Sequence, residues 1–273
     1  MKLEKLKSHT TPIVLFLLML LTYFPTFVWM WGRWFARDSY YSHGILIPAV
    51  SLALIWARRD ELRKIRPSSS GWGLFLIIFG LLLHAASSLP KVFFSSGFSI
   101  LFTLFGIVLY CYGTEICKKI AFPLAFVFFM IPMPEIIVVN LSFKMKLFAA
   151  QIATNLLNGM GILALREGST IMMRHAHVVV DDVCSGLRSL ISLMALGCLF
   201  AYWLKGPVYK KIILFLTTIP IAIITNVCRV VVLSTISEIW GPQYATGLIH
   251  DATGYMVFVL AFIMLYAAGR VIE

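Results

Sequence analysis

Long apolar runs recur along the whole sequence and constrain its fold more than any other feature. Of the 273 residues, 60% are hydrophobic, and the mean hydropathy is +0.90. A soluble domain cannot bury this much apolar surface, whereas a run of about 20 apolar residues matches the hydrocarbon thickness of a bilayer. The sequence therefore predicts an all-α polytopic membrane protein that forms one integral membrane domain over residues 1–273.

Eight of these runs are expected to cross the membrane as helices. They cover residues 12–32, 45–57, 72–88, 97–113, 120–131, 187–204, 212–236 and 252–269. Loops rich in lysine and arginine are expected on the cytoplasmic side. The basic segments are the N-terminal lysines, the cluster at 58–66, Lys118 and Lys119, and the lysines between 205 and 211. This pattern predicts a multi-pass protein of the cytoplasmic (inner) membrane with both termini in the cytoplasm.

The stretch 136–163 differs from the other apolar runs because it carries a polar stripe at helical spacing. The stripe consists of Asn140, Lys144, Gln151, Asn155 and Asn158. Such an amphipathic helix is expected to lie in the outer interface and not to cross the bilayer. The polar stretch 164–183 then lies outside as well, and its weak alternation predicts a small β-hairpin-like cap.

Charge and cysteine content exclude several classes of protein. The net charge of +11 follows from basic cytoplasmic loops, so no nucleic-acid partner is expected. The five cysteines are odd in number and match neither a disulfide framework nor a zinc pattern. No metal and no cofactor are predicted. Cys111, Cys117 and Cys198 lie in or beside apolar runs and are interpreted as small buried hydrophobic residues.

Cys184 is different, because it lies where a polar stretch meets an apolar one. Its neighbours include Asp182, Ser185 and Arg188, and an uncharged run, 191–204, follows. A helix N-terminus and a nearby cation favour the thiolate, which is the nucleophilic form of cysteine. Cys184 is therefore the candidate nucleophile, on the extracytoplasmic side of the membrane.

Two distant segments are expected to bring further polar residues to the same leaflet. Arg229 lies inside an apolar run, where a charge is costly and indicates a function, and Asn226 shares its helical face. His250 opens the last run, and Asp251 could cap that helix. An imidazole can act as acid or base near neutral pH, and an arginine can stabilise an oxyanion. Together with Cys184, these residues favour acyl transfer through a thioester.

One alternative belongs to an unrelated class of protein. Here the chain is a non-enzymatic transporter or a lipid-binding membrane protein, in which Arg229, Arg188 and His250 bind an anionic head group. This reading predicts that the cysteine is dispensable and the arginines are not.

The remaining histidines leave a third hypothesis open, a metal-dependent membrane hydrolase. His175 and His177 would lie on one face of a strand and, with His250, could hold the metal of a hydrolase. His43 is also placed outside, where it could line the entrance of the site or serve as a spare base.

The candidate residues lie in blocks that resemble those of the exosortase/archaeosortase family. The three core blocks are Val183–Arg188, Asn226–Val230 and His250–Gly254, and the other matching blocks are Tyr41–Gly44, Phe129–Pro134 and Arg166–Gly168. The blocks occur in the family order, the resemblance extends from about Asp38 to Gly254, and no core position departs from the pattern.

The resemblance implies a membrane cysteine transpeptidase that cleaves secreted proteins bearing a C-terminal sorting tail. Such a tail has a short motif (Pro-Glu-Pro in the bacterial form), a membrane helix and a basic end. Cys184 would be the nucleophile, Arg229 the cation that stabilises the oxyanion or orients the substrate, and His250 the acid and base. The positions expected to bind substrate or support these three are Arg188, Asn226, Ser185, His43 and Asp251. Membrane lipids are the other expected partners.

Overall fold

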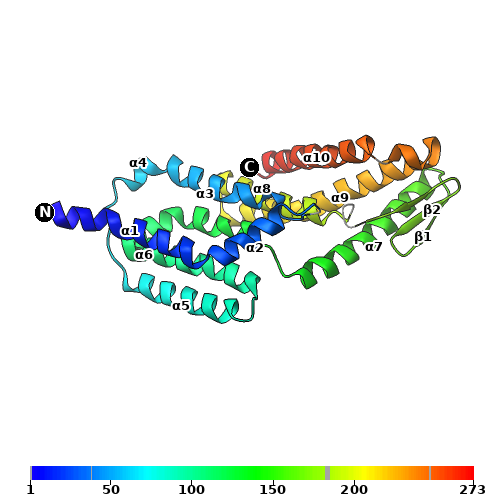
Figure 1. The fold of residues 1–273 in the computed structure, drawn as a ribbon. Helices are drawn as coiled ribbons and strands as arrows, with labels where there is room; N and C mark the ends of the chain where they lie inside the picture. The colour runs from blue at the N-terminus through cyan, green and yellow to red at the C-terminus, as the bar shows by residue number, and fades with distance from the viewer. Residues whose placement is uncertain (1, 38, 182–184, 246) are drawn as a thin grey trace. The chain divides into compact units, whose positions relative to one another are not determined.

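The computed structural model describes residues 2–37, 39–181, 185–245 and 247–273, and most of them are helical (Figure 1). The chain forms two compact units, Met1–Pro134 and Glu135–Glu273. Each unit has its own contacts and is described by itself.

The first unit consists of apolar helices joined by short connections. Its elements are α1 (Lys2–Thr22), α2 (Phe24–Trp34), η1 (Ser42–Ile45), α3 (Leu46–Ala57), α4 (Arg59–Leu62), α5 (Gly71–Ser88), α6 (Phe93–Phe126) and η2 (Val127–Met130). The axes of α1 and α2 differ by 64°. Tyr23 lies at this bend, and its buried hydroxyl is 2.9 Å from the hydroxyls of both Ser99 and Thr103 on α6.

The residues of α6 form a hairpin of two antiparallel helices. A straight helix of this length would hold its two ends about 50 Å apart. Instead, the rings of Phe98 and Phe128 are 5.3 Å apart, and a Cβ atom on Gly97 would lie 2.8 Å from Ile131. The reversal occurs at Gly113, which has φ 84° and ψ −179°. The predicted spans 97–113 and 120–131 are therefore the two arms of this hairpin.

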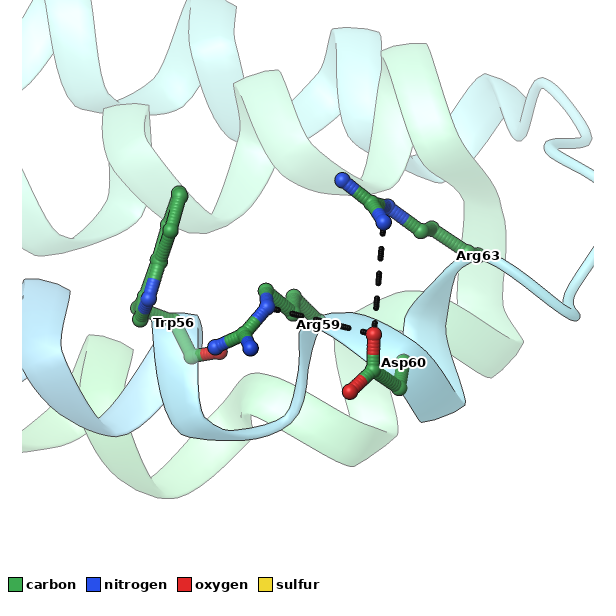
Figure 2. A network of polar contacts seen from close by, with 4 residues as sticks. All are labelled: Trp56, Arg59, Asp60 and Arg63. Carbon is green, nitrogen blue, oxygen red and sulfur yellow. Dashed lines mark hydrogen bonds and ion pairs between the residues drawn. The ribbon is translucent and has the colours of Figure 1, made fainter.

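The basic cluster at 58–66 forms an exposed end of the first unit, around α4. Figure 2 shows Asp60 between Arg59 and Arg63, with nitrogen–oxygen distances of 3.9 and 4.0 Å. The guanidinium of Arg59 also lies 5.0 Å from the ring centre of Trp56. Exposed ion pairs of this kind add little stability, and the aromatic contact is typical of a helix end at a membrane surface.

The second unit packs around one long helix. Its elements are α7 (Glu135–Gly159), β1 (Ala164–Glu167), β2 (Thr170–Met173), β3 (His177–Val179), α8 (Leu187–Trp203), α9 (Val208–Trp240), η4 (Pro242–Ala245) and α10 (Leu248–Ile272). Among these, α9 contacts α7, α8, α10 and β3 (Figure 1).

Two helices run antiparallel to α9, and close contacts at glycines fix their registers. Along α8, Gly186 meets Asn226 and Gly197 meets Thr218. Along α10, Gly254 approaches Arg229 and Gly269 approaches Leu214. Small residues allow helix backbones to approach closely in membrane proteins.

The remaining helix, α7, runs in the same direction as α9. Residues near Phe148 share a pocket with Ile223, and further along, Ala153 and Leu157 share a buried cluster with Val230. The residues of the predicted polar stripe, from Asn140 to Asn158, are exposed on α7. The helix is long and apolar enough to cross a membrane, so its placement in the outer interface remains a prediction.

The predicted hairpin-like cap is a three-stranded antiparallel sheet in the order β1-β2-β3. The two-residue turn between β1 and β2 has Gly168 with φ 61°, the backbone conformation that such turns require. Ile171 and Val180 pack in the cluster with α7 and α9. The backbone N–H of His175 donates a hydrogen bond of 2.9 Å to Glu238, near the end of α9. The cap is thus held to both helices.

The helical membrane class is confirmed, whereas the number of eight spans is not. In the described part of the chain, five helical stretches can cross a membrane by length and composition, or six if the bent pair α1–α2 counts as one. One of the five, Phe93–Met130, contains both arms of the hairpin. Two other predicted spans correspond to shorter apolar helices, Ser42–Ala57 and Leu187–Trp203.

The hairpin yields a test at Gly113. Alanine there is expected to destabilise the protein by about 1–3 kcal/mol, because only glycine adopts this backbone conformation easily. The added methyl would also collide with the backbone of Ser68. Gly32→Ala is the control, since its site in α2 is open and helical. Thermal unfolding in detergent should show a lower midpoint for Gly113→Ala alone, and equal midpoints would contradict the hairpin.

Candidate active site

The site begins at the chain segment that leads into α8. Gly186 is the N-cap of this helix and has φ 80° and ψ −3°, a left-handed conformation that favours glycine. The hydroxyl of Ser185 accepts a hydrogen bond of 3.3 Å from the backbone N–H of Leu187. Ser189 in turn donates a hydrogen bond of 2.8 Å to the carbonyl of Gly186. These bonds satisfy polar groups at the start of the helix and fix the backbone just after Cys184.

The second wall of the site comes from α9. Asn226 is buried, and a Cβ atom on Gly186 would lie 2.8 Å from its side chain. Arg229 follows less than one turn later and is also buried, with 7% of its surface exposed. A buried charge in an apolar helix is costly unless other groups or a ligand stabilise it. Asn226 and Arg229, which were predicted to share one face of this helix, thus lie beside the chain segment that follows Cys184.

The third wall comes from the first turns of α10. A Cβ atom on Gly254 would lie 3.8 Å from Nη2 of Arg229, so the guanidinium lies against the backbone of α10. The helix begins at Leu248, which places His250 in its first turn, one turn before Gly254. The structure thus brings together the chain segments of all three predicted core blocks.

The two most reactive predicted residues are described only in part. Residues 182–184 lie outside the described residues, so Cys184 is located only by its neighbour Ser185. The side chains of His250 and Asp251 are also outside the description. Their roles remain predictions. The other four cysteines are free thiols, half-buried in helices.

Arg188 lies in the first turn of α8. Its side chain is half-buried, and Nε has no hydrogen-bond partner among the described residues. A buried guanidinium nitrogen without a partner costs free energy. Arg188 could therefore bind an anionic group, in line with its predicted supporting role.

His43 belongs to the first unit, in the 3-10 helix η1. Burial lowers the pKa of its imidazole to about 4, although a hydrogen bond with the backbone of Phe129 acts to raise this pKa. At neutral pH this imidazole is therefore uncharged. Nothing places it at the site, so its role at an entrance or as a spare base remains a prediction.

The proposed histidine pair for a metal does not form on one strand. His177 is the first residue of β3, but His175 lies in the turn before it. The cap has three strands where a simple hairpin was expected. The turn between β2 and β3 covers residues 174–176, so it includes His175. In the described part of the chain, no group of three or more histidine, cysteine and acidic side chains could hold a metal ion.

A pocket of about 330 Å³ opens beside the site on the side of α7. It is lined by Lys144, Met145, Phe148, Ala149, Ser185, Ile223 and Asn226. The sequence predicts Lys144 only as part of the polar stripe. Nothing in the sequence distinguishes it from the other polar residues of α7, because the pocket also depends on residues of α9.

The architecture and the site together define a helical membrane protein with an arginine-containing site at the junction of three helices. The family model for transmembrane exosortases matches residues 31–267, nearly the whole chain. The chain therefore belongs to the transmembrane exosortase family, a family of membrane cysteine transpeptidases. No curated protein and no solved structure matches it.

The contact between Gly186 and Asn226 can be tested by substitution. Gly186→Ala adds a methyl against Asn226 and strains the backbone, so transpeptidase activity should fall by about 10²-fold if the segment before α8 moves by 1 Å. Gly161→Ala is the matched control, because Gly161 has a similar φ of 85° but no neighbour within 4 Å. Both variants should lose stability in thermal unfolding, and Gly186→Ala should lose more because its methyl also meets Asn226, so activity is compared below both midpoints. Equal activities of the two variants would show that this contact does not position the site.

Proposed function

We propose that this protein cleaves the C-terminal sorting tail of secreted proteins at the outer face of the cytoplasmic membrane. The observation that carries the proposal is the convergence of three segments: the one after Cys184, the buried Arg229, and the first turns of α10, where His250 lies. Family membership supports the reaction class.

The reaction proceeds through a thioester. The Cys184 thiolate attacks the scissile carbonyl carbon, and a C–S bond forms as the carbonyl oxygen becomes negative. The intermediate then collapses, the C–N bond breaks, and the leaving amine takes a proton from His250. An acceptor amine or water attacks the thioester and gives a proton to His250, and Cys184 leaves again as a thiolate.

Arg229 is assigned to the negative oxygen of this intermediate. Its burial matters because a charge in a poorly solvated site interacts more strongly with the developing oxyanion than it would in water. Its contact with Gly254 holds the guanidinium close to the start of α10, where the acid and base residue is placed. Asn226 and Arg188 contribute to positioning the cysteine loop and the substrate.

The substrate fits this location in the membrane. A tail with an apolar helix would cross the bilayer, present its motif at the outer leaflet and leave its basic end in the cytoplasm. With both termini of the enzyme cytoplasmic, the start of α8 and the end of α9 lie on the outer side. The tail would then reach Cys184 laterally from the lipid.

A second candidate function is supported by the arginines alone. Arg229 is buried and Arg188 has a buried nitrogen without a partner in the described chain, so the site could bind an anionic head group without any chemistry. This function requires no cysteine.

Substitution of the nucleophile separates the two candidates. Cys184→Ala and Cys184→Ser should reduce release of the tail from a tagged substrate by at least about 10³-fold, because removal of a nucleophile leaves only residual catalysis. Arg229→Ala should cost about 10²- to 10³-fold, the usual loss of one oxyanion donor. The measurement is tail removal by immunoblot, with intact mass to detect the thioester.

The control is Cys117→Ala, which removes a half-buried thiol of the first unit, outside the segments that carry the proposed chemistry. Tail removal that continues undiminished in both Cys184 variants would refute the proposal. Loss of anionic-lipid binding in Arg229→Ala, with normal behaviour of Cys184→Ala, would favour the second candidate.

A further inference from the structure

The cap formed by β1, β2 and β3 has one buried face and one exposed face. Side chains alternate between the two faces along each strand. Ile171 lies on the buried face, in the cluster with α7 and α9. The exposed face carries three large apolar residues, Leu165, Met172 and Val179, which are 69%, 44% and 47% exposed. These three residues are called the apolar patch of the cap.

The register of the sheet brings the members of the patch together. Leu165 of β1 lies directly opposite Met172 of β2, and side chains of such pairs lie next to each other on one face. Val179 of β3 lies opposite Thr170, the residue that shares this face with Met172. The patch therefore extends across all three strands.

A sheet with one face in water normally carries polar residues on that face. The exposed face of the cap departs from this rule, because its polar residues Glu167, Thr170 and His177 alternate with the apolar patch. Contiguous exposed apolar residues mark surfaces that contact another protein or a membrane. A mixed surface suits the boundary between water and hydrocarbon, where apolar side chains enter the lipid and polar ones stay among the head groups.

The position of the cap along α9 indicates which of these partners it meets. With a rise of about 1.5 Å per residue, Val230 lies about 30 Å and Glu238 about 42 Å from Lys210 along the helix. The cap contacts α9 at both positions, through the cluster with Val230 and the hydrogen bond from His175 to Glu238. A bilayer has a hydrocarbon core about 30 Å thick, or about 40–45 Å with its head groups. If Lys210 lies at one surface of the bilayer, the cap lies at the boundary of the other.

Exposed apolar residues of the neighbouring helices reach the same level. Leu156 and Met160 at the end of α7 are 47% and 61% exposed, and Leu163, which leads into β1, is 76% exposed. Figure 1 shows β1 and β2 at this end of α7. At the end of α9, Ile239 and Trp240 are also exposed, and tryptophan is enriched at membrane interfaces. The apolar patch thus continues a surface that already faces lipid.

We propose that the apolar patch of the cap is a membrane-contacting surface, and that its partner is the phospholipid leaflet on that side. Leu165, Met172 and Val179 enter the boundary between head groups and acyl chains, to a depth of about 5–10 Å. β3 ends a few residues before Cys184 in the sequence. The contact therefore anchors the strand that leads to this cysteine at the bilayer surface, whether or not the proposed reaction takes place there.

The test measures the depth of the patch in a bilayer. Leu165→Cys, Met172→Cys and Val179→Cys, each in a chain whose native cysteines are replaced, are labelled with a nitroxide and reconstituted into phosphatidylethanolamine–phosphatidylglycerol vesicles. Electron paramagnetic resonance then compares relaxation by oxygen, which concentrates in hydrocarbon, with relaxation by a water-soluble nickel chelate. The three labels should lie about 5–10 Å inside the boundary. Val259→Cys, on an exposed apolar position of α10, is the lipid control, and Lys64→Cys, at the exposed basic end of the first unit, is the water control.

Each outcome decides the inference. Access to oxygen in preference to the nickel chelate, with labels shallower than that of Val259→Cys, supports it. Access to the nickel chelate equal to that of Lys64→Cys would show that the cap face lies in water. Low access to both reagents would show that a protein surface covers the patch, and this result would also overturn the proposal. Thermal unfolding checks that each labelled variant is folded, and tail cleavage by the wild type tests the proposed function separately.

Discussion

The packing of α9 against its neighbours is the constraint on which the second unit depends. One helix contacts two antiparallel helices, one parallel helix and the cap. Its residues near Asn226 meet the start of α8, while Arg229, three residues on, meets α10. A single stretch of about one turn therefore sets the spacing between the cysteine loop and the first turn of α10. The proposed active site depends on this stretch more than on any single hydrogen bond.

The helices and the position of the buried arginine could be predicted from the sequence alone. Apolar runs of membrane length predict helices, and an arginine in such a run indicates a site, because burying a charge is costly. The polar stripe of α7 is exposed, as helical spacing predicts. The described segments after Cys184, around Arg229 and at the start of α10 lie together, and the roles of the core residues remain predictions. These features depend on local composition and helical periodicity, and both are physical properties of short segments.

Other features depend on contacts between distant segments and could not be predicted in this way. The second turn of the cap takes His175 out of the strand, because pairing with Met172 and Thr170 selected the register of β3. The direction of α7 along α9 was not foreseen, since charge counting addresses the membrane and not the neighbouring helix. The pocket that Lys144 lines together with Ile223 also depends on the packing of α7 against α9.

The glycine contact between α9 and α10 has a mechanical consequence. Gly254 presents bare backbone to the guanidinium of Arg229, and the next close glycine contact, between Gly269 and Leu214, is apolar. Contacts of this kind hold the two helix backbones close together and fix their axial register. A change of register by one residue would displace the first turn of α10 by about 1.5 Å relative to Arg229. A larger side chain at either glycine would therefore change the height of the start of α10 beside the buried guanidinium.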